Sequence, residues 1–269
     1  MKSFSGYAFD LDGTLHIDGR ALPSAVETVA RIRDGGGRVV FATNKPLETA
    51  TTYAAELTAM GIPAAATDIV TALDSLLLYL AERHPAATIL PVAEPLVADL
   101  LRSAGHRVTD DPSAAELVVV SFDRTFDYAK LNAAYRAVRL HHATLIATNP
   151  DPYCPTADGG IPDCKAMLAA IEACTGVTAE AVLGKPSRYM AGAILDRLGV
   201  PAEDAVMVGD RLATDMAMAR KLGVTAVLVL TGATSRVDVE ASTVRPDYVI
   251  DGLHQLVSAD YRAPAASRL

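Results

Sequence analysis

The chain of 269 residues has no tryptophan, only three cysteines and no run of 18 apolar residues. Cys154, Cys164 and Cys174 lie ten residues apart, without a Cys-x-x-Cys pair or a histidine at ligand spacing, so zinc ligation and a disulfide framework are disfavoured. The short apolar stretches are not those of a membrane-spanning helix, and the first residues lack the apolar core of a secretory signal. We therefore expect a cytoplasmic protein with reduced thiols.

Basic residues are also scarce relative to acidic ones. The sequence has 24 Lys and Arg against 32 Asp and Glu, a net charge of −8, and no basic cluster. This balance excludes a general nucleic-acid binder and a protein that coats acidic membranes. An anionic ligand would have to be bound by a few local groups.

Segments with strand and helix patterns alternate along the chain, which is typical of a doubly wound, Rossmann-like parallel α/β sheet. The alternation breaks at His84 and Pro85 and then restarts with its own apolar strands. We expect residues 1–84 and 182–269 to form the core domain and residues 85–181 to form an inserted α/β domain. The stretch 149–163, with four prolines and a Gly-Gly pair, is predicted to contain no regular element.

Polar residues follow four of the predicted core strands. The motifs are Asp10-Leu-Asp12-Gly-Thr, Thr43-Asn44, Gly184-Lys185-Pro186, and Gly209-Asp210 with Asp215. Each motif alone is compatible with a turn, a helix cap or a solvated loop. In a doubly wound sheet, however, the carboxyl ends of the strands open onto one crevice, so the four motifs together predict one site.

Phosphoryl transfer is the chemistry that needs this set of groups. Asp10 is the candidate nucleophile, which would form an aspartyl-phosphate, and Asp12 is the candidate general acid and base. A cluster of oxygen ligands without His or Cys suits Mg²⁺, for which we predict Asp10, Asp210 and the backbone carbonyl of Asp12 as ligands. Lys185 would offset the repulsion between nucleophile and phosphate.

The remaining motif residues have predicted supporting roles. The Thr43 hydroxyl and the backbone N–H groups that follow, beginning with Asn44, would bind the phosphoryl oxygens together with Lys185. Asp215 would orient Lys185 or a metal-bound water, and Gly209 belongs to the same turn.

With these residues in view, the chain resembles the haloacid dehalogenase superfamily. The long insertion between Thr43 and Lys185 and the runs 120–128 and 147–151 resemble its NagD-type, para-nitrophenylphosphatase-like branch. The resemblance implies a Rossmann-like core with a large α/β cap, dependence on Mg²⁺, and hydrolysis of small phosphomonoesters through an aspartyl-phosphate. It also implies a possible homodimer that pairs through the cap.

The departures from the family pattern concern the substrate. Lys45 and Pro46 follow Thr43-Asn44, and Lys45 either contacts substrate or only balances surface charge. Roles for His16, Tyr153 and Asp163 in specificity stay open. A sugar phosphate, glycerol phosphate, phosphoglycolate or a similar small phosphorylated metabolite would fit such a site.

Three other functions share parts of this pattern. A phosphotransferase or mutase would use the same four motifs, and only product analysis separates it from a hydrolase. A phospho-acceptor receiver domain also groups Asp, Thr and Lys around magnesium, but Asp12 and the long insertion argue against it. A sensor that binds phosphorylated metabolites without turnover is the third alternative.

Overall fold

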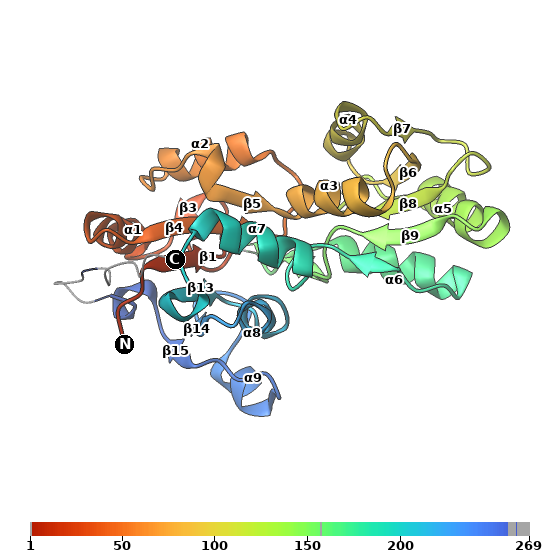
Figure 1. Ribbon diagram of the computed structural model, residues 1–269. Coiled ribbons are helices and arrows are strands. Elements are labelled where there is room, and N and C mark those ends of the chain that lie inside the picture. Colours follow the sequence, from red (N-terminus) through yellow and green to blue (C-terminus); the bar gives the residue numbers. More distant parts are fainter. Residues whose placement is uncertain (1, 157, 258–261, 263–269) are drawn as a thin grey trace.

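The computed structural model describes residues 2–156, 158–257 and 262 and contains two parallel sheets, each flanked by helices (Figure 1). The larger sheet has six strands in the order β15-β14-β13-β1-β4-β5, and every pairing in it is parallel. This arrangement confirms the predicted α/β class with a Rossmann-like core. The strands are β1 (Gly6–Phe9), β4 (Arg38–Thr43), β5 (Ile69–Thr71), β13 (Ala205–Gly209), β14 (Thr225–Val229) and β15 (Tyr248–Ile250).

Both faces of the larger sheet are buried, which explains its nearly continuous apolar strands. Tyr7, Phe9 and Phe41 contribute to the core on one face, whereas the alternate residues Ala8 and Val40 contribute to the other. The first face is covered by α1 (Ala25–Asp34) and α2 (Ala50–Ala59), and the second by α7 (Arg188–Leu198) and α8 (Ala217–Leu222). A short helix, α9 (Arg236–Ala241), follows β14.

The smaller sheet has the strand order β12-β9-β8-β6-β7 and is also parallel. Its strands are β6 (Thr88–Val92), β7 (Arg107–Val108), β8 (Leu117–Val120), β9 (Thr144–Ala147) and β12 (Ala181–Val182). Helices α5 (Tyr128–His141) and α6 (Cys164–Thr175) cover one face, and α4 (Pro95–Ser103) with α3 (Ala72–Arg83) covers the other. The division of the chain into a core domain and an inserted domain, at residues 84/85 and 181/182, stays a proposal. Strand β12 contains residues from both sides of the second boundary.

Helices α3 and α7 lie side by side between the two sheets (Figure 1). A capping box of Thr71 and Asp74 starts α3, with both reciprocal hydrogen bonds formed. Gly35, the first residue of the Gly35-Gly36-Gly37 run, ends α1. No helix within the described part of the chain is long and apolar enough to cross a membrane.

The expectation that residues 149–163 form no regular element was wrong. Two short strands, β10 (Tyr153–Cys154) and β11 (Ile161–Pro162), pair in antiparallel register there. A similar pair, β2 (His16–Ile17) and β3 (Arg20–Ala21), follows the first motif. Strands of two residues carry no alternation of apolar and polar positions, so the sequence gives no signal for them. Short one-turn helices are η1 (Ala66–Asp68), η2 (Ala202–Asp204), η4 (Leu253–Gln255) and the π-type η3 (Leu212–Met216).

Candidate active site

The four sequence motifs converge at the carboxyl edge of the larger sheet. β13, β1 and β4 are neighbours, so Asp210 and Asp10, which follow the first two strands, lie beside Thr43, which ends the third. Lys185 comes from a separate segment just after β12. The sequence places these residues up to 200 positions apart, and the parallel topology brings them to one place.

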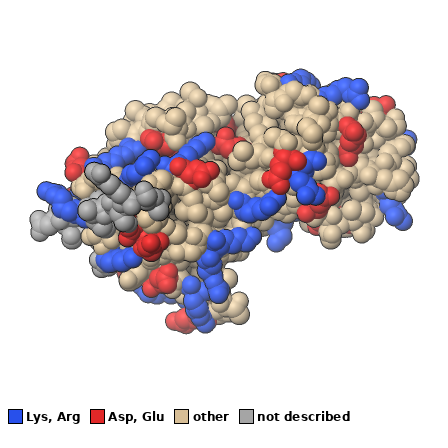
Figure 2. Space-filling model, in the orientation of Figure 1, with Lys and Arg blue, Asp and Glu red and all other residues tan. Residues whose placement is uncertain are grey.

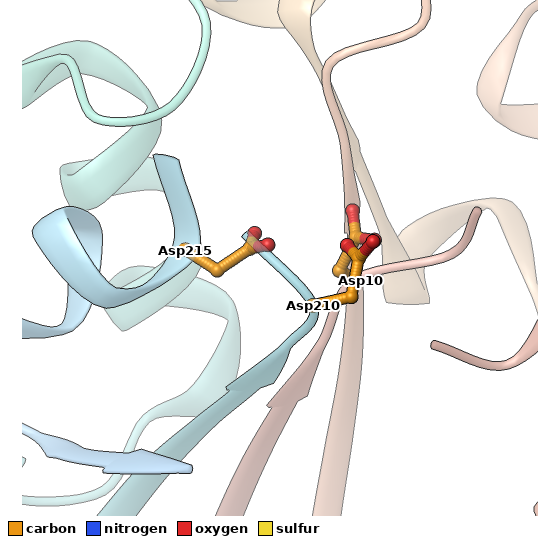
Figure 3. Close-up of side chains that lie close together, drawn as sticks. All are labelled: Asp10, Asp210 and Asp215. Atoms are coloured by element: carbon orange, nitrogen blue, oxygen red, sulfur yellow. The ribbon is translucent and has the colours of Figure 1, made fainter. Parts of the chain in front are cut away.

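Three buried carboxylates form the centre of the site. Single oxygen atoms of Asp10, Asp210 and Asp215 all lie within 4.8 Å of one another. Figure 3 shows the Asp10 and Asp210 side chains close together, with Asp215 directed toward them from the following helical segment. Asp210 and Asp215 are fully buried, so their charges are poorly screened by solvent.

Lys185 is the cation that faces this cluster, and it is only 2% exposed. Its Nζ contacts Asp10 Oδ1, lies 2.6 Å from Asp215 Oδ1 and donates to the Ala42 carbonyl at 3.1 Å. Burial by itself lowers the pKa of this ammonium, but Asp10 and Asp215 outweigh burial and raise the pKa above its ordinary value. Lys185 therefore stays charged at neutral pH.

One lysine does not balance three carboxylates. Burial raises the pKa of Asp10 well above its ordinary value, although Lys185 opposes the shift, and burial together with Asp215 raises the pKa of Asp210 to about 7. The Asp210 Oδ2 atom accepts a hydrogen bond from the Ala233 N–H at 2.5 Å, whereas its buried Oδ1 has no partner within the described structure.

These observations fit a divalent cation. Oxygen ligands, surplus negative charge and an unpartnered buried carboxylate oxygen are what a hard ion such as Mg²⁺ requires. Asp10 and Asp210 were predicted as ligands, and Asp215 joins them in the cluster. The Asp12 carboxylate is outside this cluster, and the role of the Asp12 backbone carbonyl as a ligand stays a prediction.

Gly209 permits the close approach of Asp215 to the end of β13. A Cβ atom on Gly209 would overlap the Asp215 carboxylate, so any side chain there would displace it. A Cβ atom on Gly232 would likewise overlap the Asp210 carboxylate. Gly232 was not predicted as a site residue, because it lies in the loop after β14, outside the four motifs.

Asp12 lies beside the cluster in a different environment. Its Oδ1 is 3.4 Å from the Lys45 Nζ and 4.0 Å from the His16 Nδ1, and its side chain is 15% exposed. Lys45 therefore contacts the candidate general acid, whereas the sequence left open whether it only balances surface charge. The pKa of His16 is lowered by burial, which leaves the ring neutral near pH 7.

Asn44 was predicted to bind substrate through its backbone N–H, which stays a prediction; the residue lines the site, and its side-chain amide is engaged with protein groups. Its Oδ1 accepts from the Lys185 N–H at 2.6 Å, and its Nδ2 donates to Asp151 Oδ2 at 2.8 Å. The Asn44 carbonyl accepts from Asn149 Nδ2 at 2.7 Å. Asn44 thus ties the Lys185 backbone to the segment after β9. The Thr43 hydroxyl accepts from the Lys45 N–H at 3.1 Å, which leaves its proton free to donate.

The cavity above these groups is small, about 30 Å³. Residues of the β10 segment cover it, and Arg211, which sequence reasoning missed, holds that segment. The Arg211 Nη2 donates to the Tyr153 carbonyl at 2.9 Å, and its guanidinium lies 4.7 Å from the centre of the Tyr153 ring. The position of Arg211 directly after Asp210 is the signal that could have found it. The lining residues are Asp10, Asp12, Thr43, Asn44, Lys45, Asp151, Tyr153, Cys154, Pro155, Asp163, Lys185, Arg211 and Thr214.

Comparison with known proteins supports this description. Residues 7–107 match the family model of haloacid dehalogenase-like hydrolases, and residues 182–256 match a second model for HAD-hydrolase-like proteins. The chain is 31% identical over 249 residues to the sugar-phosphatase AraL of Bacillus subtilis, and the matched region covers 93% of this chain and 90% of AraL.

Solved structures of similar proteins have the same fold over nearly the whole chain. The 4-nitrophenylphosphatase of Thermotoga maritima superposes with a TM-score of 0.86 at 32% identity, covering 94% of this chain and 96% of that one. A glycerol phosphate phosphatase of Mycobacterium tuberculosis, solved in complex with magnesium, gives a TM-score of 0.84 at 32% identity, covering 95% and 79%. The chain is accordingly a hydrolase of the haloacid dehalogenase superfamily and belongs to its NagD-type, para-nitrophenylphosphatase-like branch.

Proposed function

We propose that this protein is a magnesium-dependent phosphatase that hydrolyses small phosphomonoesters through an aspartyl-phosphate on Asp10. The observation that carries the proposal is the buried cluster of Asp10, Asp210 and Asp215 around the Lys185 ammonium. The activities named for the relatives, toward sugar phosphates, 4-nitrophenyl phosphate and glycerol phosphate, support the substrate class.

In the first half of the reaction, an Asp10 carboxylate oxygen attacks phosphorus while the bond from phosphorus to the leaving oxygen breaks. Asp12 gives its proton to that oxygen, so the alcohol departs neutral. Lys185 and the Thr43 hydroxyl bind the phosphoryl oxygens, whose negative charge would otherwise repel the nucleophile. A bound Mg²⁺ would supply further neutralisation of this charge at Asp10 and Asp210.

In the second half, Asp12 accepts a proton from water, and the water oxygen attacks phosphorus. The bond between phosphorus and Asp10 then breaks, which releases inorganic phosphate and restores the carboxylate. The Asp12 carboxylate lines the cavity but is separate from the three clustered carboxylates, so its proton transfer does not require that carboxylate to bind the cation.

The experiment that tests this function is phosphate release from para-nitrophenyl phosphate with Mg²⁺. We expect the wild-type protein to turn over and Asp10→Asn to be inactive with an unchanged circular dichroism spectrum. Turnover by Asp10→Asn at the wild-type rate would disprove the nucleophile assignment. Product analysis with added glycerol or glucose separates hydrolysis from phosphotransfer, because only a phosphotransferase or mutase makes a new phosphate ester.

A further inference from the structure

The Arg211 side chain joins the larger sheet to the β10–β11 hairpin, which covers the cavity above Asp10. Arg211 follows Asp210 at the carboxyl end of β13, whereas Tyr153 belongs to the two-residue strand β10. The Arg211 Nη2 donates to the Tyr153 carbonyl at 2.9 Å, and the guanidinium carbon lies 4.7 Å from the centre of the Tyr153 ring. The same cation therefore contacts both the backbone and the ring of Tyr153.

The surroundings of Arg211 keep its guanidinium charged and its backbone in place. Burial by itself lowers the pKa of this group, but the negative charges around it, first those of Asp151 and Asp210, outweigh burial and raise the pKa above its ordinary value. The Arg211 backbone N–H donates to Asp215 Oδ2 at 3.0 Å, which ties the base of the side chain to the carboxylate cluster. The contact with Tyr153 is therefore a charge-assisted hydrogen bond from an anchored residue.

The strands of the β10–β11 hairpin bury little apolar surface that could hold them over the cavity. They pair over two residues each, and of their four residues only Cys154 is buried. The side chains of Tyr153 and Ile161 are each 37% exposed. Segments with few buried apolar contacts open at a low cost in free energy. The two contacts from Arg211 therefore contribute a large share of the free energy that keeps the hairpin closed.

The closed hairpin leaves a cavity of about 30 Å³ above Asp10. One water molecule needs about 10–15 Å³ of such a cavity, so this one has room for about two or three waters. A phosphoryl group with its alcohol attached is larger than that, so the wall of the cavity must move when a substrate binds. Tyr153 and Cys154 are part of this wall, so the hairpin is displaced further by a larger alcohol.

We propose that Arg211 is a positioning residue, which holds the hairpin through Tyr153 and thereby limits the size of the leaving alcohol. A small alcohol leaves the two contacts with Tyr153 in place. A bulky alcohol displaces the hairpin and breaks them, so a bulky substrate reacts at a disadvantage set by the free energy of these contacts. The proposal rests on the phosphatase function above and adds a size limit that does not depend on which chemical groups the alcohol carries.

Phenyl phosphate and 2-naphthyl phosphate test the size limit, because their leaving groups are similarly acidic and differ in size. We expect the wild-type protein to prefer phenyl phosphate in kcat/KM and Arg211→Met to reduce this preference about tenfold, as for the loss of one charge-assisted hydrogen bond. Arg188→Met is the matched control, since Arg188 lies 4.6 Å from the centre of the Tyr189 ring, outside the cavity. It should keep the wild-type preference. A preference unchanged in Arg211→Met, or absent from the wild type, would overturn the proposal.

Hydrogen–deuterium exchange follows the hairpin without any substrate. In Arg211→Met the amides of residues 151–156 should exchange about tenfold faster than in the wild type, while the amides of β13 keep the wild-type rate. Arg211→Lys, which keeps the charge and a donor, should recover part of the protection.

Unchanged exchange of residues 151–156 in Arg211→Met would contradict the role of Arg211. Equally faster exchange in β13 would assign the effect to a general loss of stability and would contradict it as well. A wild-type protein inactive on every phosphate ester would instead contradict the underlying phosphatase function, whereas the exchange result would still stand.

Discussion

Replacing Lys185 with Met tests how the site tolerates its three carboxylates. The ammonium is 2% exposed and contacts Asp10, Asp215 and the Ala42 carbonyl. Methionine retains much of the aliphatic volume but removes the charge. Taking one partner from a buried ion pair costs about 3–5 kcal/mol, because the remaining charge is left uncompensated. We expect a loss of this size in the free energy of unfolding at pH 8, together with loss of turnover.

The loss should depend on pH in a definite direction. Burial already raises the pKa of Asp10, and without Lys185 the folded state will hold a proton on the cluster that the unfolded chain releases above about pH 4. Stability of the variant then falls as pH rises, by about 1.4 kcal/mol per pH unit for one proton. Because Lys185 opposes the raised pKa of Asp10 in the wild type, its removal raises that pKa further, so the deficit relative to wild type should grow between pH 6 and pH 8.

Urea unfolding in the presence of EDTA, at pH 6 and at pH 8, measures both quantities. Arg188→Met is the control, since it removes an ion pair with Glu82 whose side chains are 68% and 50% exposed. A pair this exposed contributes at most about 1 kcal/mol. If Lys185→Met were as stable as Arg188→Met at pH 8, the reasoning on the buried cluster would be refuted.

Three further predictions use other parts of the site. Asp12→Asn should reduce kcat for glycerol 3-phosphate by about 10²-fold or more. The loss of kcat for para-nitrophenyl phosphate should be smaller, because nitrophenolate leaves without a proton. Equal losses on the two substrates would argue against Asp12 as the acid. Removal of metal with EDTA should abolish activity, and added Mg²⁺ should restore it. Asp210→Asn should need a higher Mg²⁺ concentration for half of its full activity, as measured by titration of activity against Mg²⁺. An unchanged Mg²⁺ requirement would exclude Asp210 as a ligand. Burial raises the pKa of Asp163 to about 7, so the folded state retains a proton that the unfolded state loses above about pH 4. Stability should therefore fall from pH 4 to pH 7 by up to about 1.4 kcal/mol per pH unit, and urea midpoints of Asp163→Asn should lack this component.

The centre of the site was predictable because its residues follow buried parallel strands. β1, β4 and β13 are apolar runs that end in polar residues, and their carboxyl ends must meet in this topology. Asp10, Thr43 and Asp210 could therefore be brought together from the sequence alone. Lys185 also lies there, although it comes from the segment after the smaller sheet.

The surroundings of the site were not predictable in the same way. The contact of Arg211 with Tyr153 joins a turn after β13 to a two-residue strand, and neither segment has a periodic pattern. Asn44 has a motif position that suggests substrate binding, but its amide bonds to Asp151 and Lys185 depend on how a distant segment folds back. Such contacts arise between loops, where residue type alone does not specify a partner.

The short distance along the chain between β12 and Lys185 limits how the two halves of the molecule can move. Val182 is hydrogen-bonded into the smaller sheet, and Lys185, three residues later, binds the nucleophile. Three extended residues span at most about 11 Å. While Lys185 remains on Asp10, this tether keeps the end of β12 near the reacting groups, so the smaller sheet can pivot about the tether but cannot lift away as a whole. The opening through which substrate enters the site must then widen on the side away from Lys185.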